Sequence, residues 1–220
     1  MGIRFKHRAD AGQQLASRLV VEHLPSPIVV LALPRGGVPV AAEIAPVLGA
    51  RLEVLVARKI GAPGHEEFGI GAVAEGLEDA VVADAAADLG VSADQMRALA
   101  ARAQEEVQRR IRKYRGDLPL PELRGTTVIV VDDGLATGVT AEAAVRAVAQ
   151  HAPARLILAV PVCAQDTRDR LADLVDQVIC LHPPASFQAV AWWYQDFAQT
   201  TDADVLELMS RARSHAGVDT

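Results

Sequence analysis

Residues 128–140, Val-Ile-Val-Val-Asp-Asp-Gly-Leu-Ala-Thr-Gly-Val-Thr, form the stretch that decides the fold. Four consecutive β-branched residues predict a buried parallel strand, which delivers Asp132 and Asp133 to its carboxyl end, where open α/β sheets bind their ligands. The small residues that follow open a helix, whose first N–H groups have no partners within the helix and can bind a phosphate. The stretch therefore predicts a ligand with a phosphate at one end and a sugar whose hydroxyls contact the two acids.

Three other interpretations compete for the same residues. A P-loop is disfavoured because no Gly-Lys-Ser/Thr follows the strand. A dinucleotide-binding turn is disfavoured because its acid lies about 20 residues after the loop, whereas Asp132 and Asp133 precede the loop. An ordinary junction of strand, loop and helix, with an aspartate as the cap, stays open and would need no ligand.

Outward from this stretch, apolar runs alternate with helical patterns. Such alternation predicts βαβ units and an α/β fold, with a mainly parallel sheet and helices on both faces. We expect strands at 28–33, 52–56, 70–74, 81–83, 128–131, 156–162 and 178–181. We expect helices at 9–23, 38–48, 92–115, 139–150, 165–174 and 202–213, the third of them capped by Ser92. A chain of 220 residues is long enough for one domain of this class to bury its own core.

Two further segments carry glycines or cations near predicted strands. Pro34-Arg35-Gly36-Gly37 follows the first strand, and its glycines let a ligand approach the backbone beside the fixed cation of Arg35. Arg58 and Lys59 end the second predicted strand, just before the glycine-rich residues 61–76. Taken alone, these segments could be a common glycine turn and two solvated cations. Together with the acidic motif, they favour a shared site for an anionic ligand.

The pattern of residues 128–140 resembles the phosphoribosyl-pyrophosphate (PRPP) motif of the type I phosphoribosyltransferases. That motif is a hydrophobic strand, two acids, three small or apolar residues and Thr-Gly-x-Thr, and every position is filled here. The resemblance runs from about residue 10 to about residue 200, and it looks like a subgroup of predicted phosphoribosyltransferases without a settled acceptor. It implies a three-layer phosphoribosyltransferase-like fold with a helical insert and a small C-terminal hood.

The resemblance also implies a domain plan and a set of roles. The plan is one domain over 1–220, with a mobile loop and helical insert at 61–124 and a hood or tail at 183–220. The 5′-phosphate and ribose of PRPP would be bound by Asp132, Asp133, Gly134, Leu135, Ala136, Thr137, Gly138, Val139 and Thr140. Pyrophosphate would be bound by Pro34, Arg35, Gly36 and Gly37. The catalytic residues would be Asp132, Asp133, Arg58 and Lys59.

A metal and an acceptor complete the expected site. The resemblance implies Mg²⁺ as the cofactor, held by Asp132 and Asp133 either directly or through the ligand or water. Trp192, Trp193 and Tyr194 are candidates to stack on a flat acceptor. The simpler explanation of such an aromatic cluster is packing against the core.

The implied activity is transfer of the phosphoribosyl group from PRPP to a nitrogen acceptor, such as a nucleobase, with release of pyrophosphate in nucleotide metabolism. The alternative is a regulator that senses PRPP or a nucleotide with little or no turnover. This alternative depends on the predicted helix 92–115, whose seven basic residues could contact nucleic acid or a partner protein. A solvated helix face is the simpler explanation of these cations.

Composition limits the partners. A net charge of −6 gives no general attraction to nucleic acid or acidic membranes. No apolar run approaches the roughly 20 residues that span a bilayer, and the first residues lack a secretory signal. Cys163 and Cys180 are isolated, which predicts reduced thiols in a cytoplasmic protein. We therefore expect PRPP and a small-molecule acceptor as ligands, no membrane or nucleic-acid partner, and leave a homo-oligomer open.

Overall fold

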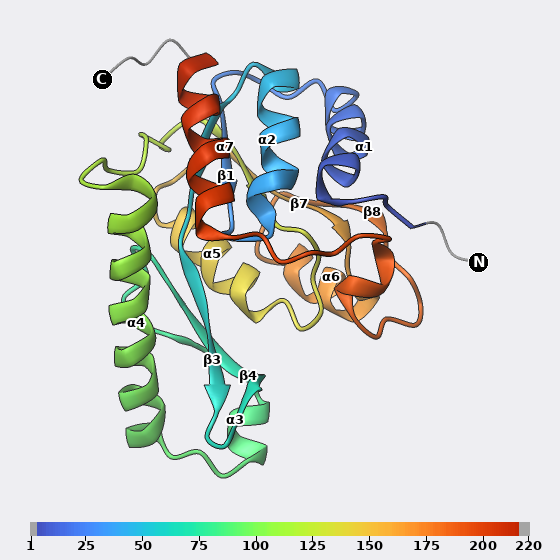
Figure 1. The fold of residues 1–220 in the computed structure, drawn as a ribbon. Coiled ribbons are helices and arrows are strands. Elements are labelled where there is room, and N and C mark those ends of the chain that lie inside the picture. Colours follow the sequence, from blue (N-terminus) through green and yellow to red (C-terminus); the bar gives the residue numbers. More distant parts are fainter. Residues whose placement is uncertain (1–3, 216–220) are drawn as a thin grey trace.

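The computed structural model describes residues 4–215 and builds them around a five-stranded parallel sheet with the strand order β2-β1-β6-β7-β8 (Figure 1). Its strands are β1 (Ile28–Ala32), β2 (Arg51–Val54), β6 (Thr127–Val131), β7 (Arg155–Val162) and β8 (Gln177–His182). All four neighbouring pairs are parallel. The central strand β6 is buried along its whole length, as expected of a strand covered on both faces.

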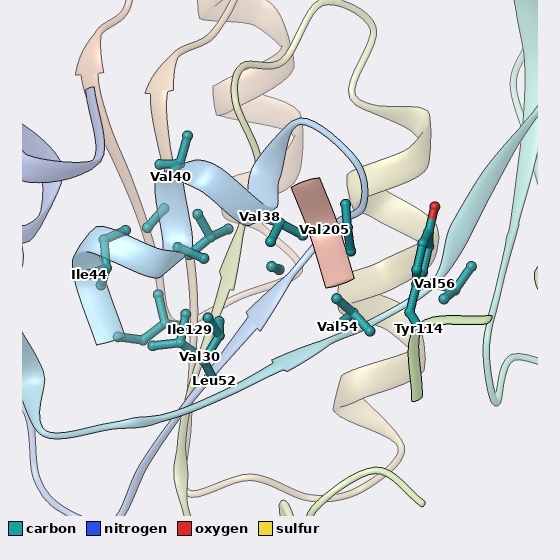
Figure 2. Close-up of a cluster of buried hydrophobic side chains, with 14 of the residues drawn as sticks. Val30, Val38, Val40, Ile44, Leu52, Val54, Val56, Tyr114, Ile129 and Val205 are labelled. Atoms are coloured by element: carbon teal, nitrogen blue, oxygen red, sulfur yellow. The ribbon is translucent and has the colours of Figure 1, made fainter. Parts of the chain in front are cut away.

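Helices cover both faces of this sheet. One face carries α1 (Arg8–Val20), α2 (Gly37–Leu48) and α7 (Asp202–His215), and the other carries α5 (Val139–Ala149) and α6 (Gln165–Ala172). Successive residues of a strand point to opposite faces, so Val30 and Ile129 join the core under α2 (Figure 2), whereas Leu31 and Val130 join the core under α5. The predicted α/β class, with a mainly parallel sheet between two helical layers, is confirmed.

A second sheet and a long helix lie between β2 and β6 in the sequence. The elements are β3 (Ala57–Ala62), β4 (His65–Ala74), β5 (Val81–Val82), α3 (Ala85–Asp88) and α4 (Ala93–Arg115). The three strands form an antiparallel sheet in the order β3-β4-β5, and α4 packs on β3 and β4. The hydroxyl of Ser92 accepts from the N–H of Gln95, whose side chain accepts from the N–H of Ser92, so the predicted cap is confirmed.

One expected position is wrong. Arg58 and Lys59 do not end the second parallel strand, because β2 ends at Val54 and both cations lie within β3. The reason is that residues 54–57 are all buried and apolar, so the chain passes from one sheet to the other without a polar residue that would mark the boundary. Every other helix and strand expected from the sequence is present, with ends that differ by a few residues.

The C-terminal part of the chain returns to the carboxyl edge of the parallel sheet. After β8, a 3₁₀ turn (Val190–Trp193) leads to Tyr194, which forms a parallel bridge with Phe5 near the other terminus. Helix α7 then packs against α2 and β2. The expected plan of one domain over 1–220, with a hood at 183–220, stays a prediction, and its residues 1–3 and 216–220 lie outside the described residues. None of the helices in the described range has both the length and the apolar character needed to cross a bilayer.

A buried ion pair fixes α4 to the rest of the fold. Arg115, the last residue of α4, has a side chain that is only 3% exposed. Its guanidinium donates to both carboxylate oxygens of Glu75 and to the carbonyl of Val54, the latter at 3.1 Å. The pair therefore joins the end of α4 to the end of β2 and to the residue that follows β4.

Replacing Glu75 with alanine is expected to lower the free energy of unfolding by about 3–5 kcal/mol, because Arg115 would stay buried without its counter-charge. Urea unfolding at pH 7 measures the change. Arg97→Ala is the control, since Arg97 and its partner Asp94 are both exposed, and it should cost less than about 1 kcal/mol. Equal costs for the two variants would contradict the role assigned to the buried pair.

Candidate active site

Two loops meet at the carboxyl edge of the parallel sheet. Strands β1 and β6 are paired with Ala32 opposite Val131, so residues 34–37 and 132–140 leave neighbouring strands at the same place. A Cβ on Gly37 would lie 2.5 Å from the carbonyl oxygen of Val131, and a Cβ on Gly36 would lie 2.0 Å from Oδ2 of Asp133. Only glycine allows this contact, so the structure brings together the two segments that the sequence singled out.

The two acids of the motif lie half-buried beside each other. Asp132 Oδ1 accepts a hydrogen bond of 2.8 Å from the backbone N–H of Asp133. Burial raises the pKa of Asp132 well above its usual range, and the neighbouring charge of Asp133 raises it further. Burial also raises the pKa of Asp133, although Arg8 opposes this shift. Two carboxylates held this closely favour the arrival of a cation or of hydroxyl donors.

Arg8 is a site residue that the sequence did not reveal. Its Nε donates to Oδ2 of Asp133 at 2.7 Å, and its Nη1 donates to the carbonyl of Ala198 at 2.7 Å. The guanidinium also lies 3.9 Å from the centre of the Phe197 ring, within range of a cation–π contact. Arg8 therefore ties the second acid to the C-terminal segment. Its partner is 125 residues away, and no local pattern around Arg8 indicates that contact.

The loop before α5 presents N–H groups that the protein leaves unused. Gly138 adopts a left-handed conformation (φ 69°) and α5 begins at the next residue. Within residues 4–215, no protein oxygen accepts a hydrogen bond from the backbone N–H of any residue from 136 to 140. The loop is fixed through its carbonyls instead, because Thr167 donates to Ala136 and Arg170 donates to Thr137, both at 2.6 Å. This arrangement leaves the N–H groups for an anion.

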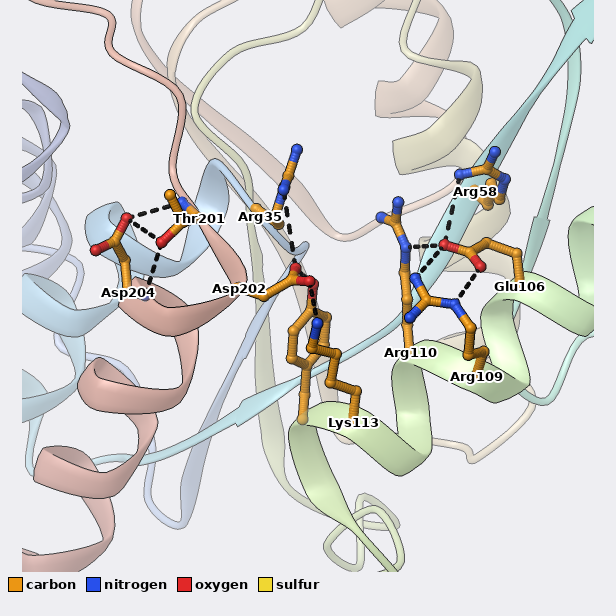
Figure 3. Close-up of polar contacts among 10 residues, drawn as sticks. Arg35, Arg58, Glu106, Arg109, Arg110, Lys113, Thr201, Asp202 and Asp204 are labelled. Atoms are coloured by element: carbon orange, nitrogen blue, oxygen red, sulfur yellow. Dashed lines mark hydrogen bonds and ion pairs between the residues drawn. The ribbon is translucent and has the colours of Figure 1, made fainter.

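The three cations expected at the pyrophosphate site, Arg35, Arg58 and Lys59, come from two different parts of the chain, the glycine loop and β3. The Arg35 guanidinium is 3.8 Å from Asp202 of α7, and the Arg58 guanidinium is 3.9 Å from Glu106 of α4 (Figure 3). The stem of Lys59 packs against Gly69, where a Cβ would lie 3.0 Å from Cδ of Lys59 and 3.6 Å from the first residue of α5. Lys59 therefore lies near the start of α5, even though β3 and not β2 carries it.

The three aromatic candidates for acceptor binding have different environments. Trp192 is 58% exposed, whereas Tyr194 is 3% exposed. The Tyr194 hydroxyl donates to the carbonyl of Asp133 at 2.6 Å, and burial raises its pKa. The ring of Trp193 stacks on His182 with 6.3 Å between ring centres. Tyr194 thus holds the backbone of the acidic motif through this hydrogen bond. The stacking role of the three residues stays a prediction.

The donor set at the acids suits Mg²⁺ bound partly by a ligand. Among the side chains that the structure describes, which within 4–215 leave out those of residues 67 and 215, no three from His, Cys, Asp or Glu gather where they could hold a metal ion by themselves. Mg²⁺ usually keeps several waters and binds one or two carboxylates together with the phosphates of a substrate. Asp132 and Asp133 fit that pattern, with the remaining oxygens to come from a phosphorylated ligand and from water.

Known proteins with similar sequences share one description. A family model described as the phosphoribosyl transferase domain matches residues 6–196. Two curated relatives, from two strains of Mycobacterium tuberculosis, carry names that assign them provisionally as phosphoribosyl transferases. Each is 41% identical over 208 residues, which cover 94% of this chain and 47% of the relative. The chain thus spans about half the length of the curated relatives it matches.

Solved structures with a similar fold include two bacterial proteins. The crystal structure of TT1426 from Thermus thermophilus is 40% identical, with a TM-score of 0.78, and the match covers 95% of this chain and 99% of that chain. The AQ2163 protein from Aquifex aeolicus is 15% identical with a TM-score of 0.51, and the match covers 80% of this chain and 74% of that chain. The second likeness concerns the fold alone.

Asp132→Asn is expected to raise the free energy of unfolding at pH 7. The pKa of Asp132 is higher in the folded state than in the unfolded state. The protonated carboxyl therefore stabilises the fold fully only below about pH 4, and this stabilisation is lost as the pH rises through the folded-state pKa. Asparagine does not titrate, and its gain over the parent should therefore shrink towards pH 4. Urea unfolding at both pH values measures this, with the exposed Asp117→Asn as control. A variant less stable than the parent at pH 7 would contradict the shift.

Proposed function

Since this chain belongs to the phosphoribosyl transferase domain family, as residues 128–140 predicted, we propose that it is a Mg²⁺-dependent phosphoribosyltransferase. It binds PRPP and transfers the phosphoribosyl group to a nitrogen acceptor, such as a nucleobase or a related heterocycle, with release of pyrophosphate. The observation that carries this proposal is the row of unused N–H groups at 136–140 beside two acids on the same edge of the sheet. A phosphorylated sugar carries the matching groups, a phosphate for the N–H groups and hydroxyls for the acids.

In this proposal each part of the site binds one part of PRPP. The N–H groups of residues 136–140 bind the 5′-phosphate, helped by the positive end of the α5 dipole. Asp132 and Asp133 accept hydrogen bonds from the ribose hydroxyls. The backbone at Gly36 and Gly37 binds the diphosphate, together with the cations of Arg35, Arg58 and Lys59. Chain elements that are far apart in the sequence thus hold one small molecule from both ends.

The reaction breaks the bond between C1′ of the ribose and the pyrophosphate oxygen, and it forms a bond between C1′ and the acceptor nitrogen. Positive charge develops on the sugar, and the two carboxylates stabilise it. The electron pair of the broken bond leaves with pyrophosphate, whose added charge the arginines and Lys59 offset. The protein thus contributes positioning and fixed charge. Asp132 and Asp133 would hold Mg²⁺, which would supply further neutralisation of the leaving group.

Arg8 supports the role of Asp133 in this scheme. Its guanidinium lowers the pKa of Asp133 against the effect of burial and so favours the ionised carboxylate. The contact occupies Oδ2 of Asp133, which leaves Oδ1 for a ribose hydroxyl or a metal-bound water. We propose that Arg8 positions Asp133 and does not itself touch the reacting atoms. Trp192, with its exposed side chain, is the aromatic residue most open to an acceptor.

The alternative of a nucleic-acid-binding regulator receives less support. Of the seven basic residues of α4, five form ion pairs with acids of this chain: Arg97, Arg109, Arg110, Lys113 and Arg115. Arg115 is also buried. Cations that are already paired gain less from phosphate contacts than a free basic stripe would. We therefore favour the transferase, in the cytoplasm, with PRPP and a small acceptor as its ligands.

The double variant Asp132→Asn with Asp133→Asn is expected to bind PRPP at least about tenfold more weakly than the parent in the presence of Mg²⁺. Each lost charge-assisted hydrogen bond should cost roughly 1.5–3 kcal/mol. Isothermal calorimetry measures the affinity. The matched control is Asp84→Asn with Asp88→Asn, which removes the same charge from exposed positions at α3. Equal affinity of the site variant and the parent would refute the role of the acids.

Turnover is expected as pyrophosphate release from PRPP in the presence of one member of a panel of nucleobases and related heterocycles. In the proposed mechanism this release should depend on the acceptor, because water has to be excluded from the reacting centre if PRPP is not to be hydrolysed. A coupled pyrophosphate assay measures the rate, and RNA or DNA binding at several salt concentrations is measured in parallel. Salt-sensitive nucleic-acid binding without any turnover would favour the regulator.

A further inference from the structure

Helix α4 carries an ion-pair cluster that faces β3. Glu106 accepts hydrogen bonds from Arg109 (2.6 Å from Nε and 2.8 Å from Nη2) and from Nε of Arg110 (2.8 Å). It also lies 3.9 Å from the guanidinium of Arg58, a strand residue of the proposed pyrophosphate site (Figure 3). The hydrogen bonds from Arg109 and Arg110 lower the pKa of Glu106 to about 2, so this carboxylate stays ionised at neutral pH.

A second cluster lies next to the first. Asp202 of α7 accepts from the hydroxyl of Tyr114 (2.5 Å), pairs with Lys113 and lies 3.8 Å from the guanidinium of Arg35. The two clusters are close enough to act on each other's groups. Burial raises the pKa of Tyr114 to about 12, while the charges of Arg110 and Arg35 both oppose that rise. Arg110 lies one helical turn before Tyr114 on α4, and Arg35 lies next to Asp202, the carboxylate that accepts from the Tyr114 hydroxyl.

The combined clusters carry more positive than negative charge. Five cations (Arg35, Arg58, Arg109, Arg110 and Lys113) face only two carboxylates, Glu106 and Asp202, which leaves a surplus of three positive charges. The chain as a whole has a net charge of −6, so this surplus is a local feature. It lies beside the glycine loop, whose Gly36 touches Asp133. A ligand group with several negative charges would balance it.

Arg110 has the geometry of an anion ligand, and Arg109 does not. Arg109 uses Nε and Nη2 for a two-pronged contact with Glu106, and its side chain is 54% exposed. Arg110 uses only Nε, and its side chain is 21% exposed. Within residues 4–215, no hydrogen bond occupies either terminal nitrogen of Arg110. A guanidinium oriented through Nε can offer both terminal nitrogens to one phosphate.

We propose that Arg110 of the helical insert is a ligand of the diphosphate end of the substrate, oriented by Glu106 and acting with Arg35 and Arg58. This role rests on the proposed phosphoribosyltransferase function. It gives α4 a place in the site, because the helix then supplies a cation to the same diphosphate as the glycine loop. It also explains why Glu106 lies among three arginines, since one carboxylate keeps the guanidiniums apart and oriented without neutralising them.

Calorimetry with three probes tests this role on the full chain: inorganic pyrophosphate with Mg²⁺, PRPP with Mg²⁺, and ribose 5-phosphate, which lacks the diphosphate. Arg110→Gln should weaken pyrophosphate and PRPP binding by about tenfold or more, because a charge-assisted contact is lost. Ribose 5-phosphate binding should stay within about twofold of the parent, because the phosphate loop and the acids are intact. Arg110→Lys, which keeps the charge without the fork, should give an intermediate loss and serves if the glutamine variant does not fold.

Arg109→Gln is the matched control, because it removes a larger part of the contact with Glu106 at an exposed neighbouring position. It should leave all three affinities within about twofold of the parent. An equal loss for Arg109→Gln, or a loss of ribose 5-phosphate binding in Arg110→Gln, would overturn the role of Arg110. A parent that binds ribose 5-phosphate but not pyrophosphate would overturn it while leaving the phosphate loop in place. A parent that binds neither PRPP nor ribose 5-phosphate would refute the proposed function itself.

Discussion

The parallel pairing of β1 with β6 is the constraint on which the candidate site depends. Because the two strands run in the same direction and end in register, the glycine loop and the acidic loop have to meet at one edge of the sheet. The absence of side chains at Gly36 and Gly37 lets the glycine loop contact the carboxylate of Asp133 and the carbonyl of Val131. Three other parts of the chain then fix the acidic loop. From α1, Arg8 binds the side chain of Asp133, and from the C-terminal segment Tyr194 binds its carbonyl. From α6, Thr167 and Arg170 bind the carbonyls of residues 136 and 137. The result is a braced loop in which, within the part of the chain that the structure describes, the backbone N–H groups of residues 136–140 have no protein acceptor.

The acids at this edge carry an electrostatic cost that a bound ligand would offset. Two adjacent carboxylates, both half-buried, have pKa values raised by burial, and the charge of Asp133 raises the pKa of Asp132 further. Arg8 relieves Asp133 in part. A metal ion or a set of hydroxyl donors would offset the rest of this electrostatic cost. Sites that bind charged ligands commonly reduce the stability of the empty protein in this way. The arginines around Glu106 carry a similar cost, because they gather excess positive charge that a bound anion would offset.

Local patterns in the sequence were sufficient for the strands of the parallel sheet, whereas the roles of the site residues stay predictions. The β-branched run of residues 128–131 predicted β6, and the resemblance to the type I phosphoribosyltransferases implied that residues 34–37 would share a site with residues 132–140. Contacts between distant segments were not predictable in this way. Arg8 meets Asp133 across 125 residues, and Glu106 meets Arg58 from another element, without a motif at either position. The boundary between β2 and β3 was missed because residues buried in two adjoining sheets form one continuous apolar run.

The central claim is that the loop before α5 binds the phosphate of a phosphorylated sugar through its backbone. Amide ¹H–¹⁵N spectra, recorded during titration with ribose 5-phosphate, test it most directly, because they report on each N–H separately. The account predicts that the amide signals of residues 136–140 shift together, with one binding constant, and that their hydrogen exchange slows. Shifts confined to other residues, with these five amides unchanged at saturation, would contradict it.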